Sequence, residues 1–299
     1  MRIGVPRETL DHEYRVGATP DTVSALTAAG HTVLVETSAG AAIGYTDDAY
    51  AQAGADITTT PYDADLIVKV KGPLPPEYPL LRTGQTVCAF FHLAANPDLA
   101  AELDQRGVQP LAYETVEDAD GRLPLLRPMS EIAGRIATQV GATSLYMAHG
   151  GCGVLLGPSA RVLIIGGGTV GTFAANSARA LGAHVTVMDV PLGDLAGELA
   201  RAHLVIGAAL IPGEKTPKLI TREMVSTMIP GSVLVDVSID QGGISETSRP
   251  TTHSEPRYID SNVVHYCVTN MPAACARTAT QALTTATLPH LLQLAVEGG

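Results

Sequence analysis

Short runs of branched apolar residues alternate along the chain with longer stretches in which apolar residues recur at helical spacing. In the first part, these patterns predict strands at residues 2–6, 31–37, 65–70, 86–93 and 108–114. Between them, a Thr19-Pro20-Asp21 cap opens a helix that runs to Ala29, and further helical patterns cover residues 46–53 and 97–106. Strands that alternate with helices predict a parallel sheet covered on both faces. The first part is therefore expected to form a doubly wound domain.

The second part of the chain repeats this alternation after a long connecting helix. A helical pattern at residues 130–147 leads to an apolar run at 162–165, and further strands are predicted at 204–210, 233–237 and 266–268. The last helical stretch, 278–296, is expected to return to the first domain. We therefore predict an α/β protein with two doubly wound, Rossmann-like domains, namely a substrate domain of residues 1–127 and 277–299 and a cofactor-binding domain of residues 128–276. Two connections between the domains predict a cleft that can open and close.

A glycine-rich turn organises the second domain. The apolar run at 162–165 is followed by Gly166, Gly168 and Gly171 in G-x-G-x-x-G spacing, then by an amphipathic helix and a second apolar run. In this pattern the first glycine permits a tight turn, the second lets the backbone approach a pyrophosphate, and the third lets the helix pack on the sheet. The pyrophosphate is expected at the helix N-terminus. Three glycines alone are a weak signal, but the full order of elements predicts a dinucleotide site.

The second apolar run ends at Asp189, about twenty residues after the glycines. A carboxylate at this position accepts hydrogen bonds from both ribose hydroxyls and repels a 2′-phosphate, which favours NAD over NADP. Only residues 190–203 then separate Asp189 from the next strand, although a Rossmann half normally fits a helix, a strand and a helix there. We therefore expect the cofactor domain to lack its third strand and about one helix, which leaves less wall on the adenine side of the pocket.

Composition and charge exclude several classes of partner. The 299 residues carry a formal net charge of −11, whereas binding to nucleic acid or to an anionic membrane requires a basic surface. No signal peptide is recognisable and no apolar run reaches the ~20 residues that span a bilayer, so we expect a cytoplasmic protein. The 4 cysteines and 9 histidines show no metal-ligand spacing, and we expect no metal.

Five polar residues lie at or just after the carboxyl ends of predicted strands, where open α/β sheets bind their ligands. These residues are Arg15, Lys71, His92, Asp240 and Asn270. A lysine at the end of a strand is usually only a solvated charge, and a histidine in an apolar run is usually a hydrogen-bonded core residue. Their expected convergence on one cleft beside a nicotinamide site makes a stronger case for an enzyme.

The chain resembles the alanine dehydrogenase family, which also includes the NAD-binding alpha subunit of proton-translocating transhydrogenase. The matching segments extend over nearly the whole sequence: RIGVPRET, EYRVGATP, ADLIVKVKGP, FFHLAA, AYETV, PLLRPMSEIAGR, GGGTVG, LVIGAALIPG, KLITREMVSTMIPGSVLVDVSIDQGG, SRPTT and YCVTNMPA. The resemblance implies reversible oxidative deamination of L-alanine by NAD to pyruvate and ammonium, in a homo-oligomer that is expected to be a hexamer.

The resemblance also implies roles for individual residues. Arg15 and Lys71 would hold the carboxylate and the carbonyl oxygen of the substrate, and Asn270 would help to bind it. His92 would be the general acid and base, and Asp240 would assist the step that involves water or ammonia. The cofactor would be contacted by the three glycines of the turn and by a further set of residues, namely Ser130, Thr169, Val170, Asp189, Leu210, Asp240, Asn270 and Met271.

The sequence departs from the family pattern at several points, and these departures leave alternatives open. Gly72 replaces a glutamate beside Lys71, Cys152 replaces a basic residue, and the segment NMPAACARTAT lacks a proline. A divergent enzyme that reduces a different 2-oxo acid or a cyclic imine is therefore a second hypothesis. A non-catalytic nucleotide-binding or assembly protein is a third, motivated by the missing strand. A hydride-transfer partner like the transhydrogenase subunit ranks last.

Overall fold

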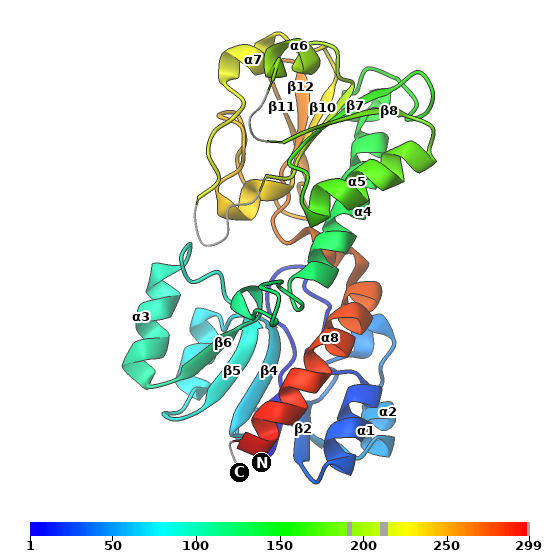
Figure 1. The fold of residues 1–299 in the computed structure, drawn as a ribbon. Helices are drawn as coiled ribbons and strands as arrows, with labels where there is room; N and C mark the ends of the chain where they lie inside the picture. Colours follow the sequence, from blue (N-terminus) through cyan, green and yellow to red (C-terminus); the bar gives the residue numbers. More distant parts are fainter. Residues whose placement is uncertain (190–192, 210–214, 298–299) are drawn as a thin grey trace. The chain divides into compact units, whose positions relative to one another are not determined.

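The computed structural model describes residues 1–189, 193–209 and 215–297, and it divides into two compact units. The first unit comprises Met1–Met129 and Ala273–Gly299, and the second comprises Ser130–Pro272. These bounds differ by two to four residues from the domain limits expected from the sequence. Each unit contains one six-stranded sheet among its described residues (Figure 1).

The sheet of the first unit has the strand order β3-β2-β1-β4-β5-β6, and all its neighbouring strands are parallel. This is the order of a doubly wound fold with its switch point between β1 and β4, as the sequence predicts. The strands are β1 (Arg2–Val5), β2 (Thr32–Glu36), β3 (Asp56–Thr58), β4 (Leu66–Lys71), β5 (Thr86–Phe90) and β6 (Gln109–Ala112). The helices are α1 (Pro20–Ala28), α2 (Asp47–Gln52), α3 (Pro97–Arg106) and α8 (Ala276–Glu297).

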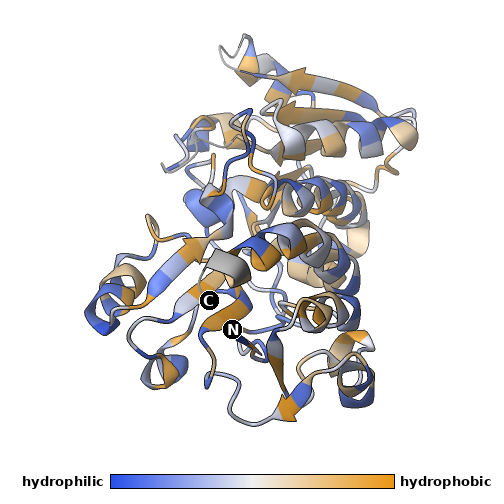
Figure 2. Cartoon of the chain, turned by 60° about the horizontal axis from the view of Figure 1, so that its bottom comes forward, coloured by the Kyte–Doolittle hydropathy of each residue, from blue (hydrophilic) through white to orange (hydrophobic). Residues whose placement is uncertain are grey.

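Two helices of this unit begin directly after a threonine cap. The Thr19 hydroxyl accepts the N–H of Thr22, and Pro20 occupies the first turn of α1, where no amide donor is needed. Thr46 caps α2 in the same way. The strands carry much of the hydrophobic colouring in Figure 2, because helices cover both faces of the sheet. Residues Leu66–Val70 of β4 are accordingly all buried, including the lysine among them.

Two predicted strands of the first unit end earlier than expected. β5 stops at Phe90 instead of residue 93, and β6 stops at Ala112 instead of residue 114. A turn follows β5, in which His92 has a positive φ, and the 3-10 helix η3 (Tyr113–Thr115) follows β6. Periodicity did not reveal these ends, because the residues beyond them are still partly apolar. Further 3-10 helices are η1 (Ala41–Ile43) and η2 (Pro75–Leu80).

The second unit has the strand order β11-β12-β10-β9-β7-β8. Its strands are β7 (Arg161–Ile165), β8 (His184–Met188), β9 (Leu204–Gly207), β10 (Val233–Asp236), β11 (Arg257–Asp260) and β12 (Val263–Tyr266). Its helical elements are α4 (Arg127–Ser144), η4 (Met147–His149), α5 (Thr169–Ala180), α6 (Leu195–Leu199), α7 (Arg222–Ser226), η5 (Val237–Gln241) and η6 (Met271–Cys275). The expected strand at 266–268 was placed wrongly, because β12 ends at Tyr266. The prediction of a purely parallel sheet was also wrong, because β11 pairs antiparallel with β12.

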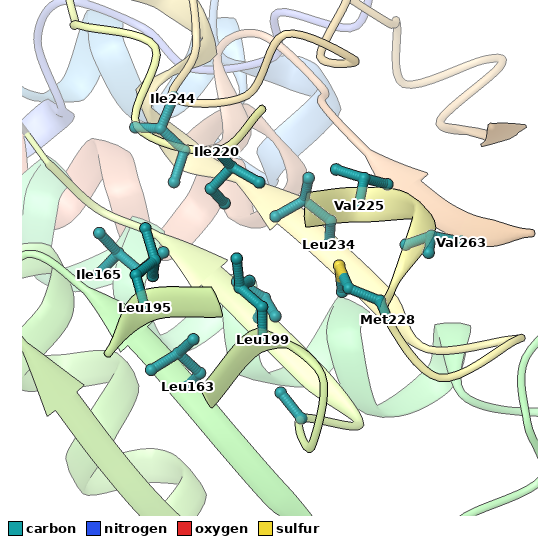
Figure 3. Packing of buried hydrophobic residues seen from close by; sticks show 12 residues of the cluster. Leu163, Ile165, Leu195, Leu199, Ile220, Val225, Met228, Leu234, Ile244 and Val263 are labelled. Atoms are coloured by element: carbon teal, nitrogen blue, oxygen red, sulfur yellow. The ribbon is translucent and has the colours of Figure 1, made fainter. Parts of the chain in front are cut away.

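A single apolar core holds α6 and α7 against the sheet of the second unit (Figure 3). Leu195 and Leu199 of α6 pack with Leu163 of β7, and Val225 of α7 packs in the same cluster as Leu234 of β10. On α4, a Cβ at Gly134 would lie 2.3 Å from the Val170 carbonyl oxygen. Only glycine therefore permits the close packing of α4 on α5.

Among the described residues, the sheet of the second unit ends at β8, which has a neighbour on one side only. In the described residues 193–203, the one regular element is α6, so this part of the chain adds no third strand beside β8, as the sequence predicts. Three of the five β8 residues are exposed, and the apolar Val187 among them is 39% exposed. A hollow of about 240 Å³ lies at the amino ends of β7 and β8, between Arg161, His184, Glu198 and Arg201. It is at the opposite end of these strands from the glycine turn.

The open edge predicts fast hydrogen exchange in β8. Because its outer amides have no strand partner, residues 184–188 should exchange faster than the central strand 161–165 under native conditions. Hydrogen exchange followed by mass spectrometry checks this. Equal protection of the two segments would show that another part of the protein, or a second chain, covers the edge.

Candidate active site

Lys71 and His92 lie at the carboxyl ends of two neighbouring strands in the first unit. Lys71 is the last residue of β4 and pairs in register with Phe90, the last residue of β5. The amide of Gly72 donates to the Phe90 carbonyl at 3.1 Å, and His92 follows two residues later. The register of the two strands shifts between Val68 and Lys71, so an irregularity in β4 directly precedes Lys71. Bulges of this kind redirect the side chains that follow them.

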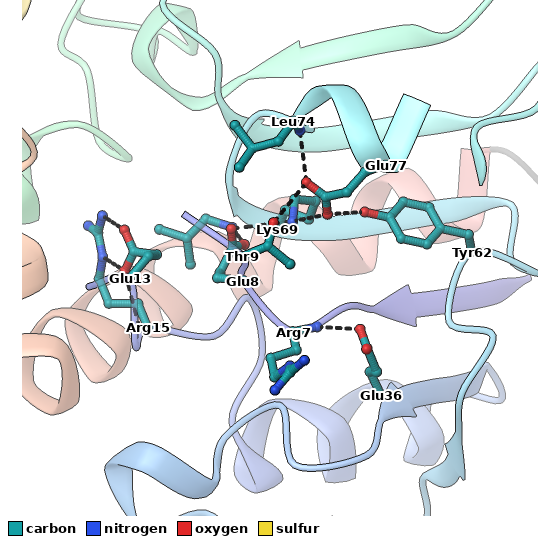
Figure 4. A network of polar contacts seen from close by, with 11 residues as sticks. Arg7, Glu8, Thr9, Glu13, Arg15, Glu36, Tyr62, Lys69, Leu74 and Glu77 are labelled. Atoms are coloured by element: carbon teal, nitrogen blue, oxygen red, sulfur yellow. Dashed lines mark hydrogen bonds and ion pairs between the residues drawn. The ribbon is translucent and has the colours of Figure 1, made fainter. Parts of the chain in front are cut away.

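A buried polar network fixes the end of β4 on both sides of Lys71 (Figure 4). The ammonium of Lys69 is fully buried, 2.9 Å from Oε1 of Glu77 and 3.3 Å from Oε2 of Glu8. The other oxygen of Glu8 accepts the amide of Val70 at 2.7 Å. The other oxygen of Glu77 accepts the amide of Leu74 at 2.8 Å, beyond Lys71. Backbone amides on both sides of Lys71 are therefore held by carboxylates, and the buried ammonium of Lys69 holds both carboxylates.

The three charged groups of this network shift one another's pKa values. Burial alone would lower the pKa of Lys69, but Glu8 and Glu77 outweigh it and raise that pKa. Burial also acts to raise the pKa of Glu77, yet Lys69, the Tyr62 hydroxyl and the Leu74 amide lower it below its ordinary value. Burial raises the pKa of Glu8, and Lys69 offsets this only in part. The ion pair of Lys69 and Glu77 is thus the charged centre of the network.

Arg15 lies in the loop after β1, which packs against β4. A Cβ at Gly17 would lie 2.3 Å from the Val68 carbonyl oxygen, so the loop passes directly over that strand. The guanidinium of Arg15 is 2% exposed and makes a two-pronged ion pair with Glu13, with Nε donating at 2.7 Å and Nη2 at 2.5 Å. Its Nη1 lies 3.3 Å from the sulfur of Met129. The residue expected to bind a carboxylate thus holds one from its own chain.

The glycine turn of the second unit has the geometry that its spacing predicts. Gly166 has a φ of +108°, and a Cβ there would lie 2.5 Å from the Ala208 carbonyl oxygen. A Cβ at Gly171 would lie 1.9 Å from the Gly166 carbonyl oxygen, so the start of α5 requires glycine there. At Gly168, in contrast, a Cβ would have no atom of the described residues within 4 Å. The space in front of α5 is open at the position where the pattern places a pyrophosphate.

The N-terminus of α5 fits an anion, because its cap residue Gly168 contributes no side-chain hydrogen bond. Thr169 and Val170, both expected to contact the cofactor, form its first turn. Asp189 follows β8, and its Oδ2 accepts the amide of Gly167 at 3.3 Å. The carboxylate therefore lies beside the turn, as in dinucleotide-binding folds. These residues fit a nicotinamide dinucleotide.

Asp240 and Asn270 are brought together in the second unit. Oδ1 of Asp240 accepts the amide of Asn270 at 3.3 Å. Asn270 is buried, with a φ of +61°, and its carbonyl oxygen lies 3.3 Å from Nε2 of His253. The segment 237–244, which contains Asp240, is fixed by the buried Asp236, whose carboxylate accepts the amides of Ser238 and Ile244. Burial raises the pKa of Asp236 in spite of these bonds.

The remaining expected cofactor residues are placed as follows. Ser130 lies in the first turn of α4, and Met271 is buried at the start of η6. Leu210 falls outside the described residues. Among the residues that the structure describes, no group of three or more histidine, cysteine or acidic side chains could hold a metal ion. No helix in the same part of the chain is long and apolar enough to cross a membrane.

Sequence reasoning missed four glutamates that hold the strand ends and loops of the first unit. They are Glu8, Glu13, Glu77 and Glu114. One signal was available, because Lys69 stands inside an apolar strand, and a lysine buried there needs a carboxylate. The signal does not say which of the 30 acidic residues supplies it. Glu13 and Glu77 are close in sequence to Arg15 and Lys69, but Glu8 and Glu114 come from distant segments, and only the folded chain brings these two to β4 and to His92.

Comparison with known proteins identifies the family. The profile described as alanine dehydrogenase/PNT, N-terminal domain, matches residues 4–133, and that of the C-terminal domain matches residues 137–196 and 192–299. The chain belongs to the alanine dehydrogenase/PNT family. It is 48% identical to an alanine dehydrogenase of Halomonas elongata and 49% identical to one of Bacillus subtilis. Both alignments cover the whole of this chain, and they cover 88% and 86% of those relatives.

A solved structure of an L-alanine dehydrogenase has the same fold, with a TM-score of 0.92 at 43% identity. That match covers all of this chain and 91% of the other. The family also explains the short second unit. The alignment with the Halomonas protein spans 328 positions against 299 residues, which leaves 29 positions of the alignment without a residue in this chain. The C-terminal profile breaks into two pieces at residues 192–196, directly after the edge strand β8.

Replacing Lys69 with methionine should destabilise the first unit in a pH-dependent way. Removing the cation leaves two buried carboxylates without a counter-charge, which costs about 3–5 kcal/mol at neutral pH. Without Lys69, burial raises the pKa of both carboxyl groups above its value in the unfolded chain. The contribution of these groups to stability is then present below the unfolded pKa and is lost as the pH rises. Urea unfolding at pH 7.5 and pH 5 checks this, with Arg122→Met at an exposed ion pair as control. A loss that is the same at both pH values would contradict the assigned role of the carboxylates.

Two glycines of the turn should respond differently to alanine. Gly168→Ala should fold normally, because its Cβ meets no atom, yet weaken binding of reduced nicotinamide dinucleotide at least tenfold by filling the open space. Gly171→Ala should impair folding, because its Cβ overlaps the backbone. Cofactor fluorescence measures binding without interference, since the chain has no tryptophan. Gly157→Ala, whose Cβ makes an ordinary contact at 3.7 Å, is the control. Unchanged affinity of Gly168→Ala would remove the turn from the cofactor site.

Proposed function

We propose that the protein is an NAD-dependent alanine dehydrogenase, which converts L-alanine, NAD and water reversibly to pyruvate, ammonium and NADH. The observation that carries this proposal is the identity of 48–49%, over the whole chain, to relatives named alanine dehydrogenase. The five polar residues singled out from the sequence are divided between the two units. Arg15, Lys71 and His92 lie in the first unit, and Asp240 and Asn270 lie in the second.

The family implies a nicotinamide cofactor, which takes up a hydride from the substrate when it is bound. We assign it to the second unit, with the pyrophosphate on the turn of Gly166–Gly171 and the N-terminal amides of α5. The carboxylate of Asp189 beside this turn supports NAD rather than NADP, because it would repel a 2′-phosphate. Ser130, Thr169, Val170, Asp240, Asn270 and Met271 complete the assigned contacts, together with Leu210, which lies outside the described residues.

In the first unit we assign Arg15, Lys71 and His92 to the substrate. The guanidinium of Arg15 would bind the substrate carboxylate, because its planar fork matches two carboxylate oxygens. The ammonium of Lys71 would polarise the carbonyl or imine carbon–heteroatom bond. The imidazole of His92 would take a proton from the nitrogen or from water and return it in the reverse direction. Asp240 would orient the water or ammonia, and Asn270 would help to hold the substrate.

Gly72 supports a second candidate, a dehydrogenase for a larger or cyclic substrate. The family glutamate beside the lysine is replaced by glycine here, and a Cβ at this position would lie 3.0 Å from side-chain atoms of Leu99 and Phe91. The local packing therefore leaves little room for the glutamate of the family pattern, and this position supplies no carboxylate beside Lys71. Activity on a cyclic imine or a longer 2-oxo acid with ammonium, without activity on pyruvate, would favour this candidate.

The resemblance also supports a cytoplasmic homo-oligomer in which six chains assemble. The net charge of −11 is compatible with a well-solvated surface. Sedimentation equilibrium of the purified protein gives the number of chains directly.

The experiment that tests the proposed function follows NADH formation at 340 nm with L-alanine and NAD. The wild-type protein should be active, and His92→Ala should lower kcat by about 10²–10⁴-fold, because a positioned acid–base group contributes this much. His149→Ala, at an exposed histidine of η4, should match the wild type. An inactive wild-type protein refutes the proposed reaction, and an active His92→Ala variant removes His92 from the mechanism.

A further inference from the structure

The backbone of His92 has a conformation that a residue with a side chain adopts only when its surroundings enforce it. Its φ is +51°, in the left-handed region, where the Cβ crowds the following carbonyl group. The residue is in the turn that leaves β5, and its ring stacks on Phe90 with an interplanar angle of 16°. Strained backbone of this kind persists where neighbouring groups hold it, and it is concentrated at functional sites.

Glu114 holds the amino side of this residue. Its Oε1 accepts the backbone N–H of His92 at 2.6 Å, which is short for an N–H···O bond and typical of a charge-assisted one. Glu114 belongs to η3, directly after β6, and β6 is the parallel neighbour of β5. The preceding residue, Tyr113, is buried and packs edge-on against Phe90 with ring centroids 5.2 Å apart. The carboxylate is therefore delivered by a rigid element.

Asn96 and its neighbour hold the carboxyl side. The carbonyl oxygen of His92 accepts the amides of Ala95 at 2.9 Å and Asn96 at 3.1 Å, and also the side-chain amide of Asn96 at 3.1 Å. The same side chain donates to the Phe91 carbonyl. Both peptide groups of His92 are therefore fixed, and the direction of its Cα–Cβ bond is fixed with them.

We propose that Glu114 is a positioning residue for the reaction, which fixes the imidazole of His92 by holding its backbone amide in the left-handed turn. The proposal rests on the proposed function, in which His92 moves the proton. The second oxygen of Glu114, Oε2, is buried and has no hydrogen-bond partner in the described part of the chain. The contact that keeps the side chain in place is the one to His92.

The test compares three substitutions in the full-length protein. Glu114→Ala removes the acceptor and should lower kcat for L-alanine at least tenfold, while KM changes less than twofold because Arg15 and Lys71 are untouched. Glu114→Gln keeps an oxygen that accepts the His92 amide and should restore kcat to within about threefold of the wild type. Glu117→Ala, at an exposed acid three residues away, should behave as the wild type.

Hydrogen exchange of residues 91–96 gives a readout that needs no activity. Exchange should be faster in Glu114→Ala than in the wild type, and close to the wild type in Glu114→Gln. If the wild-type protein does not act on L-alanine, the proposed function fails, and this exchange pattern still decides whether Glu114 fixes the turn.

Three results would overturn the proposal. The first is a wild-type kcat in Glu114→Ala. The second is a Glu114→Gln variant as slow as Glu114→Ala, which would mean that the charge acts and not the hydrogen bond. The third is a Glu114→Ala variant in which kcat falls, KM rises and the melting temperature falls together, which would indicate general loss of structure. If that variant does not fold, Asn96→Ala, which loosens the same turn from the other side, should lower kcat without raising KM.

Discussion

The buried ammonium of Lys69 is the constraint on which the carboxyl end of β4 in the first unit depends. A lysine with no exposure inside a sheet is tolerated only with carboxylates in contact, and Glu8 and Glu77 supply them. The second oxygen of each carboxylate accepts a backbone N–H. Glu8 accepts that of Val70, before Lys71, and Glu77 accepts that of Leu74, after it. The ion pairs that neutralise Lys69 inside the sheet therefore also fix the backbone on both sides of Lys71, the lysine that we assign to the substrate.

Each unit has a six-stranded sheet among its described residues, but the strand orders differ. The first has six parallel strands, whereas the second ends at β8, where a third strand would continue the sheet, and carries the antiparallel strand β11 at its other edge. The glycine turn does not depend on that strand, because the atoms that require glycine at 166 and 171 belong to β9, β7 and α5 and their connections. The turn that we assign to the pyrophosphate is therefore intact beside a shortened sheet edge.

Sequence alone predicted the alternation of strands and helices in two doubly wound units, the glycine turn and the short segment after Asp189, because each depends on local pattern or on chain length. It also predicted that Lys71, His92, Asp240 and Asn270 follow strands. It predicted neither β3 nor the antiparallel β11, because strands of 3 and 4 residues are too short to show a periodic pattern. It missed Glu8, Glu77 and Glu114, because the contacts of a charged side chain are set by tertiary packing and leave no local pattern. The positive φ of His92 was equally invisible, since histidine has no preference for that conformation strong enough to read.

The most direct test of the account follows the substrate's own hydrogen. The protein is incubated with NAD and L-alanine deuterated at Cα, and the mass of the reduced cofactor is measured. Direct hydride transfer predicts one deuterium in the reduced nicotinamide ring and pyruvate in equal amount. Deuterium released to water, or no reduced cofactor at all, would contradict an alanine dehydrogenase and leave the glycine turn as a binding site without this chemistry.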